Sequence, residues 1–465
     1  MPEPAERVTL VGAGLVGSLL AIFLARRGFR VRLFERLPDM RQTAIAAGRS
    51  INLAISERGL TALRQVGLDD EAKWHAIPMR GRVLHPVAGE LGFQAYGKDD
   101  SQCIHSISRG WLNQMLMTAA EATGRVEILF EQRLVRVDWA DQKAAFESGS
   151  PGKAASDAQR VEPFSILIGA DGGGSAVRGG MVKLPGYELS EELLEHGYKE
   201  LLLPAGPSGG FQLEKHALHI WPRGSHMLIA LPNEDGSFTC TLFLPFRGAV
   251  SFEALHGPAE VAAFFEREFP DARKLLPDLE EQFFGNPTGF MGTVKVSPWD
   301  VPGKAVLVGD AAHAIVPFFG QGMNCGFEDC LWLDRLLERH PLAVAFESFG
   351  RLRKVHSDAI ADMAVENFVE MRDRTADAHF LLEKQIEKIL LNAFPGEFLS
   401  RYTMVSFSLA PYRFAYQVGE LASGIIAELS RGLAKAEDVD LAKAGRLIRE
   451  RLVPFLKENG HGSRA

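Results

Sequence analysis

Cysteine is scarce in this sequence, and long blocks of like charge are absent. The 465 residues include four cysteines that form no CxxC pair and no regular framework: Cys103, Cys240, Cys325 and Cys330. This pattern excludes a disulfide-stapled secreted domain, and we expect reduced thiols in a cytoplasmic protein. The net charge is −8, and no run of Lys and Arg indicates nucleic-acid binding. With 46% hydrophobic and 24% charged residues, the composition is that of a globular protein of two or three domains.

Apolar runs of membrane length are also missing, apart from one at residues 8–25, VTLVGAGLVGSLLAIFLA. The residues before this run lack the basic segment of a secretion signal, and three glycines interrupt it at fixed spacing. The segment 433–465 is charged and amphipathic. We therefore expect a soluble protein with no membrane span.

Residues 7–35 have the pattern of a dinucleotide-binding unit. Arg7–Val11 and Arg30–Phe34 are predicted strands, and Leu15–Arg27 is a predicted helix between them. In the joining GxGxxG motif the glycines allow a tight turn, backbone approach to a pyrophosphate, and close helix packing. Glu35 is placed to bind ribose hydroxyls and disfavours a 2′-phosphate, so FAD or NAD is expected. A tight turn without ligand is the alternative. The residues concerned are Gly12, Gly14, Gly17, Glu35 and Arg36.

Two further glycine-rich stretches follow predicted strands. The first, residues 164–175, places Asp171 after an apolar strand, where it either contacts a cofactor or caps a glycine-rich turn. The second, GDAAHAIVPFFGQGMNCGFED at 309–329, follows the buried strand predicted at 305–308. Pro317 prevents an early helix there, so we expect the helix to begin near Gly320. Neither stretch has GxGxxG spacing, and the chain contains no second dinucleotide-binding unit of that type.

Together these motifs resemble those of the class A flavoprotein monooxygenases, aromatic hydroxylases in which one FAD lies across all three. The resemblance implies that Asp310 binds the ribityl chain and that the helix near Gly320 directs its positive end at the flavin ring. Arg109 matches the family pattern R-x-x-L-x-x-x-L through Leu112 and Leu116, which implies a cofactor contact. Arg178 resembles a family arginine near the access of NAD(P)H. The implied cofactor residues are Gly12, Gly14, Gly17, Glu35, Arg36, Ala54, Arg109, Asp171, Asp310, Pro317, Gly320, Gly322, Met323 and Asn324.

The lack of a second dinucleotide unit fits this family, because its nicotinamide donor binds transiently and leaves. That lack also makes a two-nucleotide disulfide reductase a poor interpretation, since no CxxxxC or CxxC lies near the flavin motifs. The remaining alternatives are a hydroxylase of phenolic acids such as hydroxybenzoates, and a flavin protein that reports redox state without turnover.

Several sequence blocks outside the flavin motifs resemble the kynurenine-hydroxylating members of the family: GRSINLAISERG, MRGR, YGKDDS, HGYKEL, HIWPRG and ENFVEMR. The resemblance runs from residue 7 to about residue 412. It implies the reaction of L-kynurenine with NADPH and O₂, through a flavin C4a-hydroperoxide, to 3-hydroxy-L-kynurenine in the kynurenine pathway of tryptophan catabolism and pyridine nucleotide biosynthesis. A soluble form, as in bacteria, is expected rather than a membrane-anchored one.

The same resemblance implies a substrate site. Its head-group clamp consists of Arg82, Tyr96, Asn367 and Tyr402, of which the guanidinium pairs with the substrate carboxylate. Met227, Ile229 and Leu231 alternate along a predicted strand and therefore share one face of a sheet. That face is either an apolar wall for the substrate ring or simply core. The other implied contacts are Leu218, Phe243, Phe318, Phe319 and Met371.

No side chain is needed as a catalytic acid or base, because the flavin carries the chemistry. We expect His313 to be structural and no residue to bind metal. Phe368 departs from the tyrosine common in relatives, which removes a hydrogen bond near Asn367.

The predicted fold is α/β: a Rossmann-like FAD-binding domain, an inserted substrate-binding β-sheet domain and a helical C-terminal region. The FAD domain is expected at 7–80, 105–180 and 290–345, the sheet domain at 81–104 and 181–289, and the helical region at 346–465. The C-terminal helices either cover the active site or join two copies in a homodimer, and the sequence leaves both open.

Overall fold

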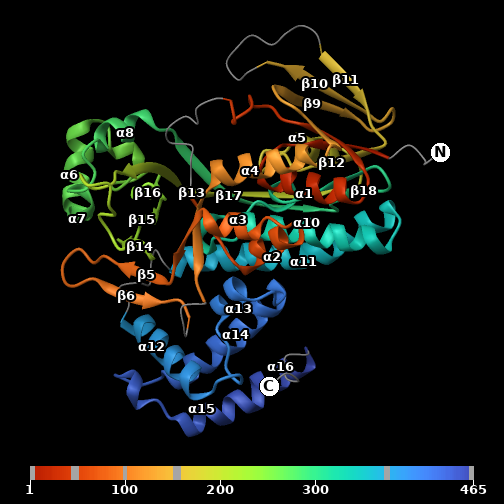
Figure 1. The fold of residues 1–465 in the computed structure, drawn as a ribbon. Coiled ribbons are helices and arrows are strands. Elements are labelled where there is room, and N and C mark those ends of the chain that lie inside the picture. The colour runs from red at the N-terminus through yellow and green to blue at the C-terminus, as the bar shows by residue number, and fades with distance from the viewer. Residues whose placement is uncertain (1–5, 43–51, 98–101, 150–158, 371–377, 460–465) are drawn as a thin grey trace.

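The computed structural model describes residues 6–42, 52–97, 102–149, 159–370 and 378–459. Its first layer is a six-stranded sheet in the order β18-β19-β12-β1-β2-β8 (Figure 1), parallel except for β18. The predicted strand–helix–strand unit is present, with the helix ending one residue earlier than expected. The strands are β1 (Arg7–Val11), β2 (Arg30–Phe34), β8 (Val126–Leu129), β12 (Ile166–Gly169), β18 (Asp300–Val301) and β19 (Ala305–Leu307).

Helices on this sheet bury its apolar strands in one large core. Val8, Leu10, Leu33 and Leu167 have no exposed surface there, as expected for parallel strands covered on both faces. The helices of this part are α1 (Leu15–Arg26), α2 (Glu57–Gln65), α3 (Asp69–Trp74), α4 (Arg109–Ala122), α5 (Ala176–Met181), α9 (Asp310–His313) and α10 (Gly322–Arg339).

A seven-stranded sheet in the order β17-β13-β16-β15-β14-β5-β6 lies beside this layer (Figure 1). Three of its strands lie within residues 216–246, and one of them contains the predicted strand with Met227, Ile229 and Leu231. Only the β14–β5 pair is parallel. The strands are β5 (Gly81–Leu84), β6 (Gly92–Ala95), β13 (Glu188–Leu203), β14 (Ala217–Pro222), β15 (Met227–Pro232), β16 (Phe238–Pro245) and β17 (Thr288–Ser297).

The two faces of this sheet have different neighbours because side chains alternate along each strand. Leu201, Leu228, Cys240 and Leu242 point to one face, where they pack against three short helices. Met227, Ile229 and Leu231 point to the other face, as predicted, and contact the FAD-binding side of the molecule. The covering helices are α6 (Pro258–Glu268), α7 (Pro270–Arg273) and α8 (Leu279–Gly285).

Two three-stranded sheets complete the strand content of the described residues. The sheet of β9, β10 and β11 lies at the upper edge of the molecule in Figure 1. Their strands are β3 (Asn52–Ile55), β4 (Ala76–Met79) and β7 (Ile104–Ser108), and β9 (Gln132–Asp138), β10 (Lys143–Ser148) and β11 (Gln159–Pro163).

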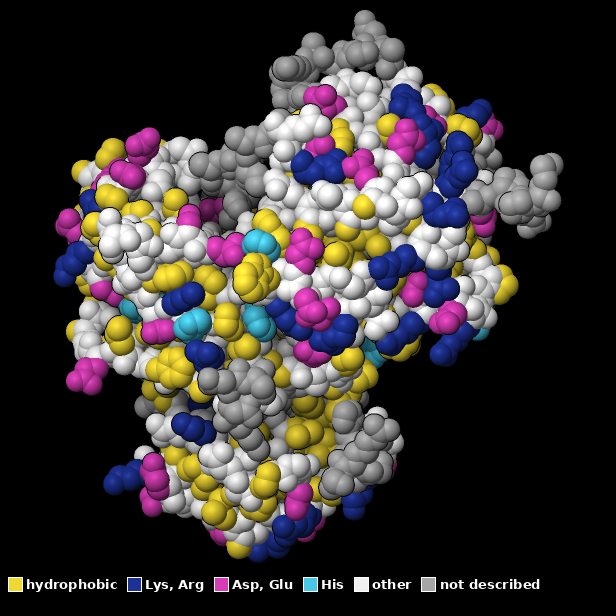
Figure 2. Space-filling view, in the orientation of Figure 1, with side chains coloured by type: hydrophobic (Ala, Val, Ile, Leu, Met, Phe, Trp, Pro, Cys, Tyr) yellow, Lys and Arg dark blue, Asp and Glu magenta, His cyan; other side chains and the backbone are white. Residues whose placement is uncertain are grey.

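The C-terminal third is helical and has a core of its own. Ile386 and Leu390, four residues apart, are fully buried in it, whereas Leu381 is exposed. Among the described residues, no helix combines the length and the apolarity that crossing a membrane requires. Figure 2 shows side chains of both charge signs intermixed over the visible face. The helices are α11 (Leu342–Val369), α12 (Ala378–Ala393), α13 (Arg401–Phe407), α14 (Tyr412–Leu429), α15 (Leu441–Leu447) and α16 (Val453–Glu458).

Candidate functional site

The turn between β1 and α1 distinguishes the three glycines of the GxGxxG motif. A Cβ on Gly12, whose φ is +99°, would lie 2.4 Å from the Ala170 carbonyl oxygen, and a Cβ on Gly17 would lie 1.9 Å from that of Gly12. Within the part of the chain that the structure describes, a Cβ on Gly14 would meet no atom within 4 Å, and no side chain caps the helix there. Two glycines therefore serve packing, while the third leaves an open helix N-terminus that fits a pyrophosphate.

Glu35 lies directly after β2 and faces this turn. Its carboxylate accepts hydrogen bonds from the backbone N–H groups of Ala13, at 2.8 Å, and Leu37, at 2.9 Å. The neighbouring Arg36 is exposed to solvent. The half-buried carboxylate of Glu35 is thus held at the end of the strand, in the position from which such a group binds ribose.

Asp171 caps helix α5, which was one of its two expected roles. Its carboxylate accepts from the Ser175 hydroxyl at 2.5 Å and from the N–H groups of Ala176 and Val177 at 2.7 and 3.2 Å. The backbone at Asp171 also packs on Gly12, where a Cβ would lie 2.8 Å from its Cα. The structure therefore gives this residue a local role in shaping the loop, and a direct cofactor contact stays a prediction.

Arg178 is buried rather than placed at a surface. Its guanidinium donates to the carbonyl oxygens of Gly173 and Ala311, at 2.5 and 3.0 Å, and pairs with Glu191 at 2.8 Å. These bonds join the loop after β12 to the GDAAH segment. A contact with NAD(P)H stays a prediction for Arg178.

The segment after β19 contains two sharp turns, at Gly309 and Gly320, whose φ values are +63° and +64°. Between them lie the single helical turn α9, although no helix was expected before Gly320, and a 3₁₀ turn, Pro317–Phe319, that begins with Pro317. Asp310 is exposed at the start of α9. Helix α10 then begins at Gly322, two residues later than expected, and no side chain of the described residues caps it. A second open helix N-terminus therefore follows the exposed carboxylate.

Asn324 fixes this second turn to strand β3. Its amide donates to the carbonyl oxygens of Ala54 and Gly320, at 2.9 and 2.8 Å, and its oxygen accepts from the Ser56 N–H at 2.9 Å. Gly322 and Met323 are partly exposed beside it. Asn324 therefore sets the position of the backbone that the family resemblance assigns to the flavin ring.

Arg109 is the first residue of α4 and is exposed, whereas Leu112 and Leu116 of the same pattern are fully buried. Burial raises the pKa of Glu200 on β13 to about 7, and the positive charge of Arg109 opposes that rise. Arg109 therefore faces the space between the two large sheets, although its contact with a cofactor stays a prediction.

Three predicted clamp residues come together from three different elements. The rings of Tyr96, after β6, and Tyr402, on α13, stack with centroids 5.2 Å apart. Burial raises the pKa of both phenols, and the nearby charge of Arg82 lowers both. Arg82 itself donates to the Gln94 amide oxygen at 3.0 Å. A guanidinium and two aromatic hydroxyls thus converge, a set that fits an amino-acid head group.

The fourth clamp residue, Asn367 on α11, lies beside the aromatic wall. Its amide donates to the Phe318 carbonyl oxygen at 2.6 Å. The next residue, Phe368, stacks on Phe318 with centroids 4.3 Å apart and meets His196 edge-on. Phe368 therefore fills an apolar cluster where a tyrosine would place its hydroxyl.

The predicted wall residues belong to two neighbouring apolar clusters that share Ile229. Met227, Phe243, Phe318 and Phe319 lie in one, and Leu218, Leu231, Tyr96 and Ala54 lie in the other. The wall is thus continuous from the flavin segment to the clamp. Met371 lies outside the described residues.

Sequence reasoning missed a buried charge network beneath the GDAAH segment. Asp329 accepts from the Gly309 N–H at 3.1 Å, from His313 at 2.5 Å and from Arg353 at 2.7 Å. Burial lowers the pKa of His313, but Asp329 outweighs it, so this pKa lies well above the usual value. The cationic His313 is structural, as expected. Adjacent carboxylates at 328 and 329, in the largely apolar first part of α10 (residues 322–333), were the hint in the sequence.

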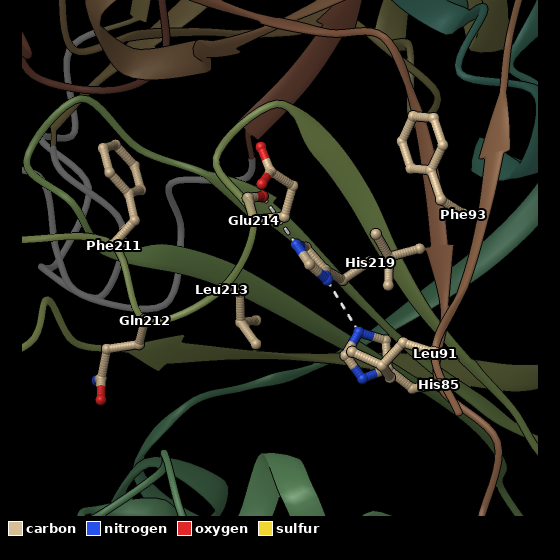
Figure 3. A pocket seen from close by; sticks show the side chains of 9 residues that line it. His85, Leu91, Phe93, Phe211, Gln212, Leu213, Glu214 and His219 are labelled. Atoms are coloured by element: carbon tan, nitrogen blue, oxygen red, sulfur yellow. Dashed lines mark hydrogen bonds between the residues drawn. The ribbon is translucent and has the colours of Figure 1, made fainter. Parts of the chain in front are cut away.

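A separate pocket of about 500 Å³ lies on the opposite face of the seven-stranded sheet, behind the clamp strand β5 (Figure 3). His219 contacts the Glu214 carbonyl oxygen at 2.9 Å and His85 at 2.9 Å, and His85 contacts Asp271 at 2.6 Å. Burial lowers the pKa of His219 to about 4.

Comparisons with known proteins agree with this geometry. A family model described as "FAD binding domain" matches residues 6–229 and 295–340. The kynurenine 3-monooxygenase of Myxococcus xanthus (strain DK1622) is 62% identical over 99% of this chain and 98% of its own length. That of Dictyostelium discoideum is 44% identical over 96% of this chain and 98% of its own length.

Solved structures with the same fold are more distant in sequence. A tetrameric form of 2-methyl-3-hydroxypyridine-5-carboxylic acid oxygenase matches with a TM-score of 0.64 and 20% identity, over 82% of this chain and 95% of its own. Pseudomonas aeruginosa PqsL in complex with 2-aminobenzoylacetate matches with a TM-score of 0.64 and 18% identity, over 81% of this chain and all of its own. The full-length relatives and the matching FAD-binding domain together show that this chain belongs to the kynurenine 3-monooxygenase family of flavoproteins.

Proposed function

We propose that the protein hydroxylates L-kynurenine to 3-hydroxy-L-kynurenine with FAD, NADPH and O₂, as a step of tryptophan degradation. The observation that carries this proposal is the convergence of Arg82, Tyr96 and Tyr402 beside an apolar wall. Phe319 of that wall stacks on Tyr402 and lies three residues before the open N-terminus of α10. A substrate with a charged amino-acid head and an aromatic ring fits this arrangement.

Each part of the site has a distinct task in the proposed reaction. Arg82 pairs with the substrate carboxylate, and Tyr96, Tyr402 and Asn367 supply hydrogen bonds to the rest of the head group. The apolar wall holds the aniline ring and excludes water from it. Positioning is therefore the main contribution of the chain, because proximity and orientation lower the barrier without an acid or base.

FAD fits the residues present, since the open side of Gly14 and the two uncapped helix N-termini suit a dinucleotide. Gly14 and the start of α1 would hold the pyrophosphate, Glu35 the adenosine ribose, and Asp310 the ribityl chain. Bound FAD supplies the transfer of electrons from NADPH to O₂. The free N–H groups at the start of α10 stabilise negative charge on the group beside them.

We also infer a cytoplasmic location, and the buried thiols of Cys240, Cys325 and Cys330, which form no disulfide, support it. The domain limits given above, the role of Met371 and the association of two copies into a homodimer remain proposals as well. Light scattering of the purified protein, over a range of concentrations, measures the last of these directly.

The test is an assay of purified protein. We expect a yellow protein whose NADPH oxidation is stimulated by L-kynurenine and yields a product heavier by one oxygen in mass spectrometry. 4-Hydroxybenzoate serves as the control substrate and should give neither stimulation nor product. Stimulation with peroxide but no hydroxylated product would contradict the proposed reaction and leave kynurenine as an effector.

A further inference from the structure

Arg58, a fully buried arginine on α2, holds one end of the helix that carries Tyr402. Its guanidinium donates to the carbonyl oxygen of Val405, at 3.1 Å, and to that of Ala410. Val405 lies in the last turn of α13, and Ala410 lies between α13 and α14. Carbonyl groups at a helix C-terminus lack partners within the helix and attract cations. Arg58 therefore caps α13 from a distant segment of the chain.

The same guanidinium is anchored to the flavin-binding side. Its third nitrogen pairs with Glu328 on α10 at 2.8 Å, and the second oxygen of Glu328 lies 2.9 Å from Arg353. Arg353 in turn pairs with Asp329, which holds Gly309 and His313. A continuous buried chain of charges thus runs from the GDAAH segment to Arg58.

An aromatic contact makes a second link between the same elements. The guanidinium of Arg58 lies 3.9 Å from the ring centroid of Tyr412, the first residue of α14. The Tyr412 hydroxyl donates to the Gln321 amide oxygen at 2.8 Å, directly before α10. Both links therefore tie the start and the body of α10 to the α13–α14 turn.

Tyr402 lies one helical turn before Val405, so the position of α13 decides where its ring lies. That ring stacks between Tyr96, at 5.2 Å, and Phe319, at 5.8 Å. We propose that Arg58 is a positioning residue for the substrate clamp: it fixes α13 against the flavin-binding helix, so that Tyr402 meets Tyr96 and Arg82. This inference rests on the proposed function.

Arg58→Lys is the sharpest test, because lysine keeps the charge opposite Glu328 while a single ammonium replaces the three-pronged contact. Arg64→Lys is the matched control, since Arg64 lies on the same helix with its side chain 45% exposed. Kynurenine affinity is measured without turnover, from the change that the substrate causes in the flavin spectrum. FAD content, Tm and kcat are measured alongside.

We expect Arg58→Lys to weaken kynurenine binding and raise KM by about tenfold, with kcat and FAD content near wild type. Its Tm should fall, because buried carbonyl oxygens lose their donors. Arg64→Lys should leave all of them unchanged. In a Tyr402→Ala background, Arg58→Lys should add no further loss, because the two residues act through one contact. Unchanged binding in Arg58→Lys, or fully additive losses, would overturn the proposal.

Ser408→Ala provides the test if Arg58→Lys does not fold. Ser408 donates to the Met404 carbonyl oxygen at 2.7 Å and so holds the same end of α13 without a buried charge. KM for kynurenine should rise in this variant with FAD content unchanged, and an unchanged KM would count against the proposal. If the flavin spectrum of the wild-type protein does not change when kynurenine is added, the proposed function itself is refuted.

Discussion

At the scale of single residues, arginine takes two roles that differ by surroundings rather than by local sequence. Arg82 is partly exposed and, among the described residues, has one side-chain hydrogen-bond partner, Gln94, which leaves donors for a substrate. Arg178 and Arg58 are buried, and backbone carbonyl oxygens occupy their donors. A guanidinium has five N–H donors in a fixed plane. The number of donors that protein acceptors leave unused indicates whether the arginine can bind a ligand or serves to hold the fold.

Arg82→Ala should raise KM for L-kynurenine at least about tenfold, because a charge-assisted hydrogen bond contributes about 1.5–3 kcal/mol. Steady-state kinetics with varied kynurenine measures the effect. Gln94→Ala is the control: it frees the guanidinium without removing it, so KM should change much less. Equal effects of the two substitutions would remove Arg82 from the clamp.

Asp310→Ala should purify with little flavin, since the exposed carboxylate at the start of α9 is the group proposed to hold the ribityl chain. The ratio of flavin to protein absorbance measures this loss. Asp310→Asn keeps the shape and one acceptor, and it should retain more FAD than the alanine variant. A fully yellow Asp310→Ala protein would contradict the assignment.

At the scale of elements, the strand–turn–helix unit at the N-terminus separates folding from ligand binding. Gly12 and Gly17 are packed against backbone, and Gly14 is open. The same motif therefore contains two positions whose substitution disturbs the protein and one whose substitution disturbs only what binds to it.

Gly14→Ala should keep the wild-type Tm and lose FAD affinity by about tenfold or more, because φ at this residue is −71° and its Cβ would enter the ligand's space. Gly17→Ala should instead lower Tm or prevent folding, since its Cβ would clash with the Gly12 carbonyl. Thermal unfolding without added FAD and a flavin fluorescence titration separate the two outcomes. A large loss of Tm in Gly14→Ala would contradict the open site.

Local patterns in the sequence predicted these elements well, and long-range contacts explain what they missed. The strands at Arg7–Val11 and Arg30–Phe34 and the helix beginning at Leu15 are in place, because glycine spacing and apolar periodicity act over a few residues. The capping by Asp171 was one of two open interpretations. The sequence shows a carboxylate at this position but does not show which groups donate hydrogen bonds to it. Arg58 was not predicted at all, because its partners lie some 270 to 350 residues further along the chain.

Across the whole molecule, two buried histidines have pKa values shifted in opposite directions. Both contribute to the way in which the free energy of unfolding depends on pH. Burial lowers the pKa of His226, which packs against Phe264 and Phe269, to about 4. Asp329 raises the pKa of His313. The contribution of His313 to the free energy of unfolding is therefore complete in acid and is lost as the pH rises through its pKa in the folded state. The contribution of His226 depends on pH in the opposite way. The unfolded chain binds a proton at His226 more readily than the folded chain does, so acid favours unfolding.

The free energy of unfolding should therefore fall as pH drops from about 6.5 towards 4, and His226 should account for up to about 3 kcal/mol of the fall. Above pH 6.5 His226 is neutral in both states and has no effect. His226→Phe should flatten this acid limb in urea unfolding measured at several pH values. His256→Phe, at an exposed position, is the control and should leave the limb unchanged.

The residues proposed to bind FAD come from two distant parts of the chain. The turn at Gly12–Gly17 is synthesised early, whereas Asp310 and α10 are synthesised late. A ribosome adds about 5–20 residues per second, so the two halves emerge at well separated times. A nascent chain that stops before Gly309 has the pyrophosphate turn but lacks the carboxylate and the second helix N-terminus. All of these groups can therefore bind FAD together only after the chain has been synthesised past α10. The yellow colour of bound FAD then marks that stage of synthesis.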